Sequence, residues 1–326
     1  METQKLIQIT GINSSHINGI PTKSSFTEFV SSKGLLAPPG NQHVGRVVCI
    51  DYSAAAAKDL RKLRLGRDNC TLLRMEPSVV LPANYSKSRQ SKFGKIITVG
   101  GTSGMGSTRV PWPLVWPTEA SIESISASDR LERIVLINGN KMSLIKGELY
   151  SLRRRAISKI ANLDLYGTDW DSKFVSRVLI LARNFAHSLL SLQIPRLSAT
   201  SLWFQAYPKS KGLVKDKIGT MAKYKYALVI ENSAEYMSEK LMEALFAGCI
   251  PIYVGPNTED FGIPMELVVR AKPDITSIQN AFAEASGWNS EDFHKKLKTF
   301  LKAKEVRDTW DHQLVYQQLL EEIQKQ

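Results

Sequence analysis

The residues best suited to chemistry follow one apolar segment in the second half of the chain. The run from Tyr226 to Ile230 is continuous and apolar, and it predicts a buried strand that ends where Glu231 and Asn232 begin. Open α/β folds bind ligands at the carboxyl edge of their parallel sheet, so both side chains are placed where a ligand would lie. Glu231 could there accept hydrogen bonds from ribose or sugar hydroxyls.

A helix predicted over 238–247 begins at the same edge. Ser238 is expected to cap it, and its free backbone N–H groups would then favour an anion. Lys240 lies in the first turn against the usual preference for acidic residues, which is tolerable if a diphosphate lies beside it. Its charge would then stabilise a departing nucleotide, while Glu239 accepts hydrogen bonds from hydroxyls. The alternative interpretation is a capped amphipathic helix with a solvated Glu-Lys pair.

Alternating strands and helices must position these groups. In the first half, strands are predicted over 5–12, 44–52 and 70–75, with a helix over 54–65 between the second and the third. This βαβ order indicates a parallel sheet. A second α/β unit is expected from residue 131, with strands over 133–138, 163–166, 226–230 and 250–254 and helices over 147–161, 174–191, 238–247 and 291–303.

Two Rossmann-like α/β domains facing each other across a cleft are the simplest architecture. We expect an acceptor-side domain over 1–130 and a donor-binding domain over 131–326, with a terminal helix over 309–325 that packs back on the first domain. The stretch 76–117, rich in Pro, Ser and Gly, is expected to form loops of the active site.

Composition narrows the class of protein. The net charge of +12 indicates an anionic partner, but the basic residues fall in several separate groups, so no nucleic acid is expected. A nucleotide-sugar diphosphate, with an anionic glycolipid or membrane surface nearby, explains the balance equally well. No membrane span or signal sequence is recognised, which predicts a cytoplasmic protein that can contact the inner face of a membrane. Cys49, Cys70 and Cys249 are expected to be core thiols.

The segment from Lys223 to Pro264 carries a specific resemblance. It is similar to the C-terminal signature of the α-1,3-fucosyltransferases, glycosyltransferase family 10, in which Y-K-[FY]-x-L-x-[FI]-E-N-S leads to Y-[VM]-[TS]-E-K and a P-[IV]-x-x-G turn. The matching residues here are Tyr224, Lys225, Tyr226, Leu228, Ile230, Glu231, Asn232, Ser233, Tyr236, Met237, Ser238, Glu239, Lys240, Pro251, Ile252 and Gly255. Ser238 departs from the usual Thr.

The resemblance implies a GT-B fold and an inverting transfer of fucose from GDP-fucose to a hydroxyl of an oligosaccharide or glycolipid acceptor, of the α-1,3/4 type. It implies a donor site built from Glu231, Asn232, Tyr236, Glu239 and Lys240. No metal or other cofactor is expected.

Two further segments extend the resemblance upstream. The run 148–157 resembles the family's helix that carries an arginine in contact with the donor diphosphate, which implies this role for Arg153 or for its neighbour Arg154. The run 72–82 resembles the strand end that carries the catalytic base, which implies that role for Glu76. The alternatives are a solvated basic helix face for the arginines and an exposed loop residue for Glu76.

Other classes of protein remain as alternatives to this hypothesis. A related transferase with another nucleotide sugar is the nearest, because the motif specifies the diphosphate better than the base or the sugar. A basic protein that binds nucleic acid or a membrane surface on a degenerate transferase scaffold is the second. The glycine-rich run 99–106 resembles a nicotinamide-binding turn, but prolines follow where its helix should begin. Asp169 and Asp171 have the Asp-x-Asp form of a metal site, for which a capping role is preferred.

Overall fold

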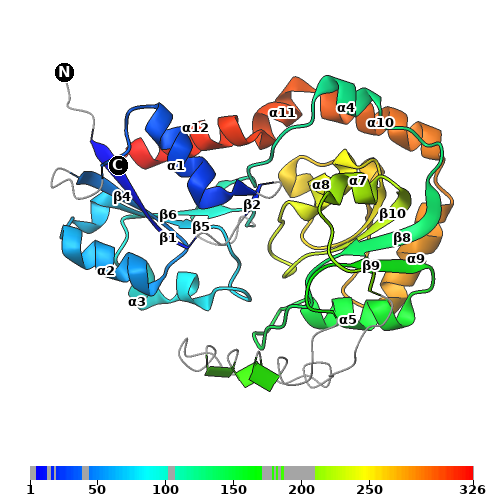
Figure 1. Ribbon diagram of the computed structural model, residues 1–326, viewed down its shortest axis with the longest axis horizontal. Coiled ribbons are helices and arrows are strands. Elements are labelled where there is room, and N and C mark those ends of the chain that lie inside the picture. Colours follow the sequence, from blue (N-terminus) through cyan, green and yellow to red (C-terminus); the bar gives the residue numbers. More distant parts are fainter. Residues whose placement is uncertain are drawn as a thin grey trace. The chain divides into compact units, whose positions relative to one another are not determined.

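The chain folds into two compact units. The computed structural model describes residues 5–12, 16–17, 20–38, 44–101, 107–170, 178–179, 181–182, 185–186 and 210–325. The first unit comprises Met1–Trp116 and Arg307–Gln326, and the second comprises Pro117–Val306 (Figure 1). The units divide after Trp116, rather than near residue 130 as expected from the sequence, because helix α4 (Glu119–Glu123) and the chain up to residue 130 belong to the second unit.

The first unit is built on a parallel five-stranded sheet. Its order is β1-β4-β5-β6-β7, with the bounds β1 (Leu6–Gly11), β4 (Val44–Ile50), β5 (Cys70–Arg74), β6 (Lys95–Val99) and β7 (Thr108–Val110). Leu36 adds a parallel bridge on the outer side of β1. After β1 the chain pairs through Leu36 on the outer side of β1, and it then returns to form β4 on the inner side of β1. This reversal is the winding of a Rossmann-like domain.

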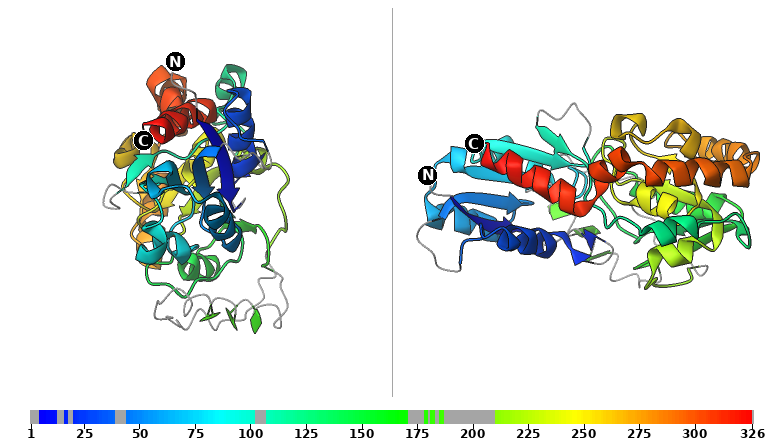
Figure 2. Two further views of the ribbon diagram at one scale, coloured as in Figure 1. Left: turned by 90° about the vertical axis from the view of Figure 1, so that its left-hand side faces the viewer. Right: turned by 90° about the horizontal axis from the view of Figure 1, so that it is seen from above.

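Helices cover both faces of this sheet. Helices α1 (Thr22–Ser32) and α12 (His312–Gln324) lie on one face, whereas α2 (Ala54–Leu63) and α3 (Lys87–Gln90) lie on the other (Figures 1 and 2). The terminal helix α12 belongs to the first unit although it ends the chain, and Lys95 pairs with Glu322 of that helix at 3.0 Å. The predicted terminal helix is split by a break between α11 (Lys304–Trp310) and α12.

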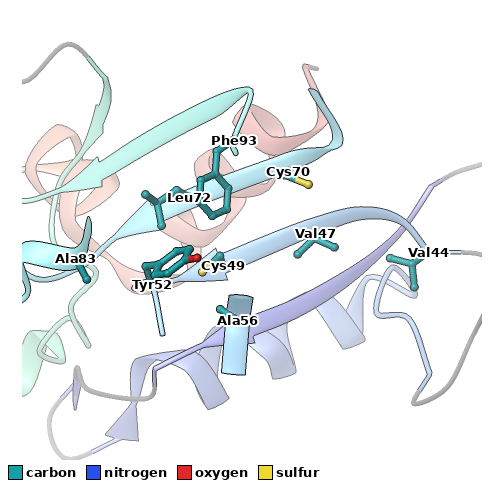
Figure 3. Packing of buried hydrophobic residues seen from close by; sticks show 9 residues of the cluster. All are labelled: Val44, Val47, Cys49, Tyr52, Ala56, Cys70, Leu72, Ala83 and Phe93. Atoms are coloured by element: carbon teal, nitrogen blue, oxygen red, sulfur yellow. The ribbon is translucent and has the colours of Figure 1, made fainter. Parts of the chain in front are cut away.

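A buried apolar cluster joins α2 to the sheet (Figure 3). All five residues of β5 are buried, and Leu72 is fully enclosed between the strands and Phe93. Cys49 and Cys70 belong to this cluster, and all three cysteines of the chain are buried free thiols, which confirms their prediction as core residues. Burial raises the pKa of Cys49 to about 12, so this thiol is unreactive near neutral pH.

The second unit contains another parallel sheet, of order β12-β11-β10-β8-β9. Its strands are β8 (Leu131–Ile137), β9 (Leu163–Tyr166), β10 (Tyr224–Ile230), β11 (Ile250–Val254) and β12 (Val269–Arg270). Numbered along the chain from β8, this is the doubly wound order 2-1-3-4-5, in which the winding reverses between β8 and β10. A ligand site is expected at the carboxyl ends of those two strands.

Six helices and the start of a seventh belong to the described part of the second unit. Their bounds are α4 (Glu119–Glu123), α5 (Tyr150–Lys159), α7 (Lys217–Met221), α8 (Lys240–Phe246), α9 (Ile275–Ser286), α10 (Ser290–Lys302) and the start of α11. Helices α7 and α8 contact each other, and α5 contacts α9. The helix predicted over 174–191 lies largely outside the described residues. Within the described part of the chain, no helix is long and apolar enough to cross a membrane.

Candidate functional site

The strand register brings the predicted residues to the switch point of the second sheet. Ala227 of β10 pairs with Val135 of β8, so Asn138 and Glu231 follow the ends of two neighbouring strands. Asn138 is 7% exposed and Glu231 is fully buried. A small cavity of about 10 Å³, lined by Asn138, Lys217 and Lys240 among others, adjoins these strands. It has room for about one water molecule.

Glu231 is linked to Lys240 by hydrogen bonds through the hydroxyl of Ser238. The carboxylate of Glu231 accepts hydrogen bonds from the backbone N–H of Ser238 at 3.1 Å and from its hydroxyl at 2.7 Å. The ammonium group of Lys240 donates to the same hydroxyl at 2.6 Å and lies 3.5 Å from Glu231 Oε2. Because Glu231 has no exposed surface, this buried carboxylate fixes Lys240 and does not itself reach solvent.

Ser238 does not cap helix α8, contrary to the expectation from the sequence. The helix begins at Lys240 with Glu239 at its N-cap position, and no side chain makes a capping hydrogen bond there. The hydroxyl oxygen of Ser238 accepts from the ammonium group of Lys240, and no backbone N–H of the helix donates to it. The helix has only 7 residues, so its amino end is a weaker source of positive potential than a helix over 238–247 would supply. The cation at this edge is the side chain of Lys240.

A second lysine extends the charged network. Glu239 Oε1 lies 3.9 Å from the ammonium nitrogen of Lys240 and 3.8 Å from that of Lys217, which also pairs with buried Glu243. Burial alone would raise the pKa of Glu239, but the two ammonium groups lower it to about 2. Glu239 is therefore an anion at neutral pH, held between two cations, and its side chain keeps 23% of its surface exposed.

Lys217 and Glu243 were not among the residues expected from the sequence. Glu243 lies one helical turn after Glu239, so helical spacing could have indicated that it shares the same face. Lys217 comes from helix α7, and only the packing of α7 against α8 brings it to the carboxylates.

The structure separates the two candidate arginines. Arg153, which is 3% exposed, donates to the carbonyl of Ile230 at 3.1 and 2.6 Å and to the side-chain oxygen of Asn232 at 3.0 Å. Burial lowers the pKa of Arg153, and the ring of Tyr150 faces its guanidinium at 4.8 Å. Arg154 instead donates to the carbonyl of Lys141 at 2.8 Å. Arg153 is thus the arginine that reaches the end of β10.

Close packing explains two further positions of the segment that resembles the family signature. A Cβ atom on Gly255 would lie 2.3 Å from the hydroxyl oxygen of Tyr253 and 2.9 Å from Cγ of Glu231, so only glycine fits above the buried carboxylate. Tyr236 is 1% exposed, and its backbone bridges to Ser233 within the loop that follows β10. This loop is tied to the start of α5, because the Leu149 N–H donates to the carbonyl of Asn232 at 3.0 Å.

Glu76 lies in the first unit, directly after β5. Its backbone N–H donates to Asp51 Oδ1 at 3.2 Å, and its carbonyl accepts from the hydroxyl of Tyr85 at 3.3 Å. Asp51 is fully buried with φ of 53° and also accepts from the N–H of Met75 and from the amide of Asn84. Asp51 and Asn84, which were not predicted as functional residues, therefore hold the backbone that carries Glu76. The position of Asp51 directly after a buried strand was the available signal.

The Asp-x-Asp segment follows β9. Trp170 is 1% exposed and its indole N–H donates to the carbonyl of Asn138 at 2.5 Å, so it anchors the end of β8. Asp171 lies outside the described residues. Among the residues that the structure describes, no group of three or more His, Cys, Asp or Glu side chains is arranged to hold a metal ion.

Comparisons with known proteins bear on the fold and on one short segment. No family model matches the chain. A fucosyltransferase-like protein of Arabidopsis thaliana is 43% identical over 49 residues, which are 14% of this chain and 10% of that protein. The match thus spans about a tenth of the length of this curated relative.

The solved structures cover nearly the whole chain at low identity. Anabaena HepE in complex with UDP-glucose matches 98% of this chain and all of that one, with 9% identity and a TM-score of 0.56. A UDP-forming trehalose-phosphate synthase from Burkholderia xenovorans in complex with glucose-6-phosphate matches 92% of this chain and 78% of that one, with 10% identity and a TM-score of 0.52. These structures are GT-B glycosyltransferases. The fold of this chain is of the GT-B type. An α1,3-fucosyltransferase with GDP reaches a TM-score of 0.49 at 11% identity, which is too low to bear on the donor.

Proposed function

We propose that this chain is a glycosyltransferase that binds a nucleoside diphosphate sugar at the carboxyl ends of β8 and β10 and transfers the sugar to a hydroxyl of an acceptor. One observation carries the proposal: the ammonium group of Lys240 is held at this edge by the buried carboxylate of Glu231 through the hydroxyl of Ser238. A preorganised cation at the switch point of a doubly wound sheet suits the negative charge that develops on a departing diphosphate.

We propose GDP-fucose as the donor and a glycan hydroxyl as the acceptor. The resemblance of residues 223–264 to the fucosyltransferase signature supports this choice, and so does the short match to a fucosyltransferase-like protein. A transferase that uses another nucleotide sugar is the second candidate, favoured by the fold that this chain shares with a protein in complex with UDP-glucose.

The roles in the donor site follow from exposure and contacts. Lys240 would face the diphosphate, and Glu239, a partly exposed anion between two lysines, would accept hydrogen bonds from ribose or sugar hydroxyls. Arg153 would bring positive charge to the diphosphate and hold Asn232 in place. Glu231 acts as a positioning residue for Lys240.

Two buried residues complete the proposed donor site. Tyr236 would shape the loop after β10, and Arg154 would support helix α5 through the carbonyl of Lys141. Neither side chain is exposed, so both would act on the geometry of the site.

The proposed reaction is a single inverting displacement. Glu76 takes the proton from the acceptor hydroxyl as its oxygen forms a bond to the anomeric carbon. The bond from that carbon to the diphosphate oxygen breaks, and its electron pair leaves with GDP, whose charge Lys240 and Arg153 stabilise. The protein supplies the positions of both reactants.

The choice of donor is tested by release of the nucleotide. The protein is incubated without added metal with GDP-fucose, GDP-mannose or UDP-glucose and a mixture of oligosaccharide acceptors, and free GDP or UDP is measured. Release from GDP-fucose alone supports the proposal, and release from UDP-glucose alone favours the second candidate. Release from none, in a protein that also fails to bind GDP, would contradict glycosyl transfer at this site.

A further inference from the structure

The positive charge of the chain is concentrated in one stretch of the first unit. Residues 54–95 carry ten Lys and Arg against three Asp and Glu, so this stretch supplies +7 of the net charge of +12. In the sequence these cations form separate groups, one around α2 and one around α3. The structure places both helices on the same face of the first sheet (Figure 1).

Contacts at both ends join the two groups into one surface. Near the end of α2, Arg67 donates to the carbonyl of Phe93 at 3.4 Å, and its own carbonyl accepts from the Gly94 N–H at 2.7 Å. Near the start of α2, Lys92 donates to the hydroxyl of Tyr52 at 3.1 Å, and Arg89 lies 5.4 Å from the same ring. Residues 92–94, which directly follow α3, therefore lie beside the segments that flank α2 at both of its ends.

The cations of this surface are exposed and uncompensated. We call it the α2–α3 basic surface and define it by six exposed residues: Lys58, Arg61, Lys62, Arg64, Lys87 and Lys92. None of the six forms an ion pair with another described residue. In the second unit, by contrast, several cations are paired, as Lys302 is with Glu123 and Lys225 is with Glu132.

Stabilisation of the helix dipole explains the positions of only some of these unpaired cations. Arg61 and Lys62 lie in the last turn of α2, where cations complement the helix dipole. Lys58 lies one turn earlier. Lys87 begins α3 and Lys92 follows it, and this helix of 4 residues has little dipole of its own. The apolar residues of α2 face inward, since Leu60 and Leu63 pack against the core cluster. The outward face offers charge without apolar side chains for insertion.

We propose that the α2–α3 basic surface docks the first unit on an anionic lipid bilayer. Long, exposed and unpaired lysine and arginine side chains suit a diffuse negative potential, and each contributes to binding near such a surface. Single-stranded nucleic acid is less well matched, because the ring of Tyr52 beside these cations is 8% exposed and is contacted by Arg89 and Lys92, so it is no platform on which bases stack. Without apolar insertion, the binding depends on salt.

Vesicle co-sedimentation of the full chain tests this proposal. The vesicles contain phosphatidylcholine alone or with about 30 mol% phosphatidylglycerol. We expect binding to the anionic vesicles alone, with loss at about 0.5 M salt. The triple variant Lys58→Gln, Arg61→Gln, Lys62→Gln should bind roughly a hundredfold more weakly, because each cation near an anionic surface contributes about fivefold.

A matched triple variant controls for net charge. Lys159, Lys272 and Lys295 are exposed in the second unit, and their replacement by Gln removes the same charge while leaving the vesicle affinity within about twofold. The variant Lys87→Gln, Lys92→Gln tests the α3 side without touching α2, and circular dichroism and melting temperature establish that each variant folds. Equal weakening by both triple variants, or absence of vesicle binding by the native chain, would overturn the proposal. An oligonucleotide bound more tightly than the vesicles and lost with Lys58, Arg61 and Lys62 would replace the lipid by nucleic acid.

Discussion

Replacement of Lys240 by Met separates its two roles, as partner of a buried carboxylate and as a cation for the ligand. The variant leaves fully buried Glu231 with hydrogen bonds from Ser238 but without its ammonium partner 3.5 Å away. Breaking a buried ion pair in this way costs about 3 kcal/mol of unfolding free energy. If Lys240 also contacts the diphosphate, loss of a charged hydrogen bond of about 1.5–3 kcal/mol lowers the GDP affinity about ten- to hundredfold.

The double variant Lys240→Met, Glu231→Gln distinguishes these effects. It removes both charges, so its unfolding free energy in urea should return to within about 1 kcal/mol of the native value. Its affinity for GDP, measured by calorimetry, should stay as low as that of the single variant. Recovery of GDP affinity in the double variant would contradict a contact between Lys240 and the diphosphate, because it would show that Lys240 serves only to neutralise Glu231.

Three further predictions concern other parts of the chain. Glu76→Gln should abolish transfer while GDP-fucose binding by calorimetry stays unchanged, and retained transfer would assign the base elsewhere. Gly255→Ala places a Cβ atom 2.3 Å from the hydroxyl of Tyr253, so both the melting temperature and the GDP affinity should fall; an unchanged melting temperature would contradict the packing argument. Burial alone would raise the pKa of Asp164, but hydrogen bonds led by that of Arg133 lower it to about 2, which stabilises the fold above pH ~4 by about 2 kcal/mol. That contribution is lost as the pH falls from about 4 to about 2, so acid titration of Asp164→Asn should show a smaller loss than the native chain.

Continuous apolar runs predicted seven of the ten strands of the two sheets, but β6 and β7 lie in the stretch 76–117 that was expected to form loops, and the two-residue strand β12 was not predicted. The predicted strands over 163–166 and 250–254 match β9 and β11, and in β11, where all five residues are buried, the apolar run ends where the strand ends. Helix α1 was missed, since only Phe26, Phe29 and Val30 form its buried stripe within a polar segment. The bridge at Leu36 was also missed, and with it the reversal of winding in the first unit.

The sequence predicted the residues of the candidate site that are close to one another in the chain, but not those that only the fold brings to them. The segment from Glu231 to Lys240 drew attention because it follows an apolar strand, and the structure brings its ends together through Ser238. The burial of Glu231 depends on the close approach of Gly255 from the next strand. Lys217 enters through the packing of α7 on α8. These contacts join residues far apart in sequence, and helix or strand periodicity carries no information on them.

Calorimetric titration with GDP, UDP and NADH in the absence of metal tests whether the edge that holds Lys240 binds a nucleoside diphosphate. We expect saturable binding of GDP to the native chain, weaker binding of UDP and no binding of NADH. Binding of NADH without binding of either diphosphate would contradict this expectation, because the ligand site would then belong to the glycine-rich segment 99–106 and not to the edge that holds Lys240.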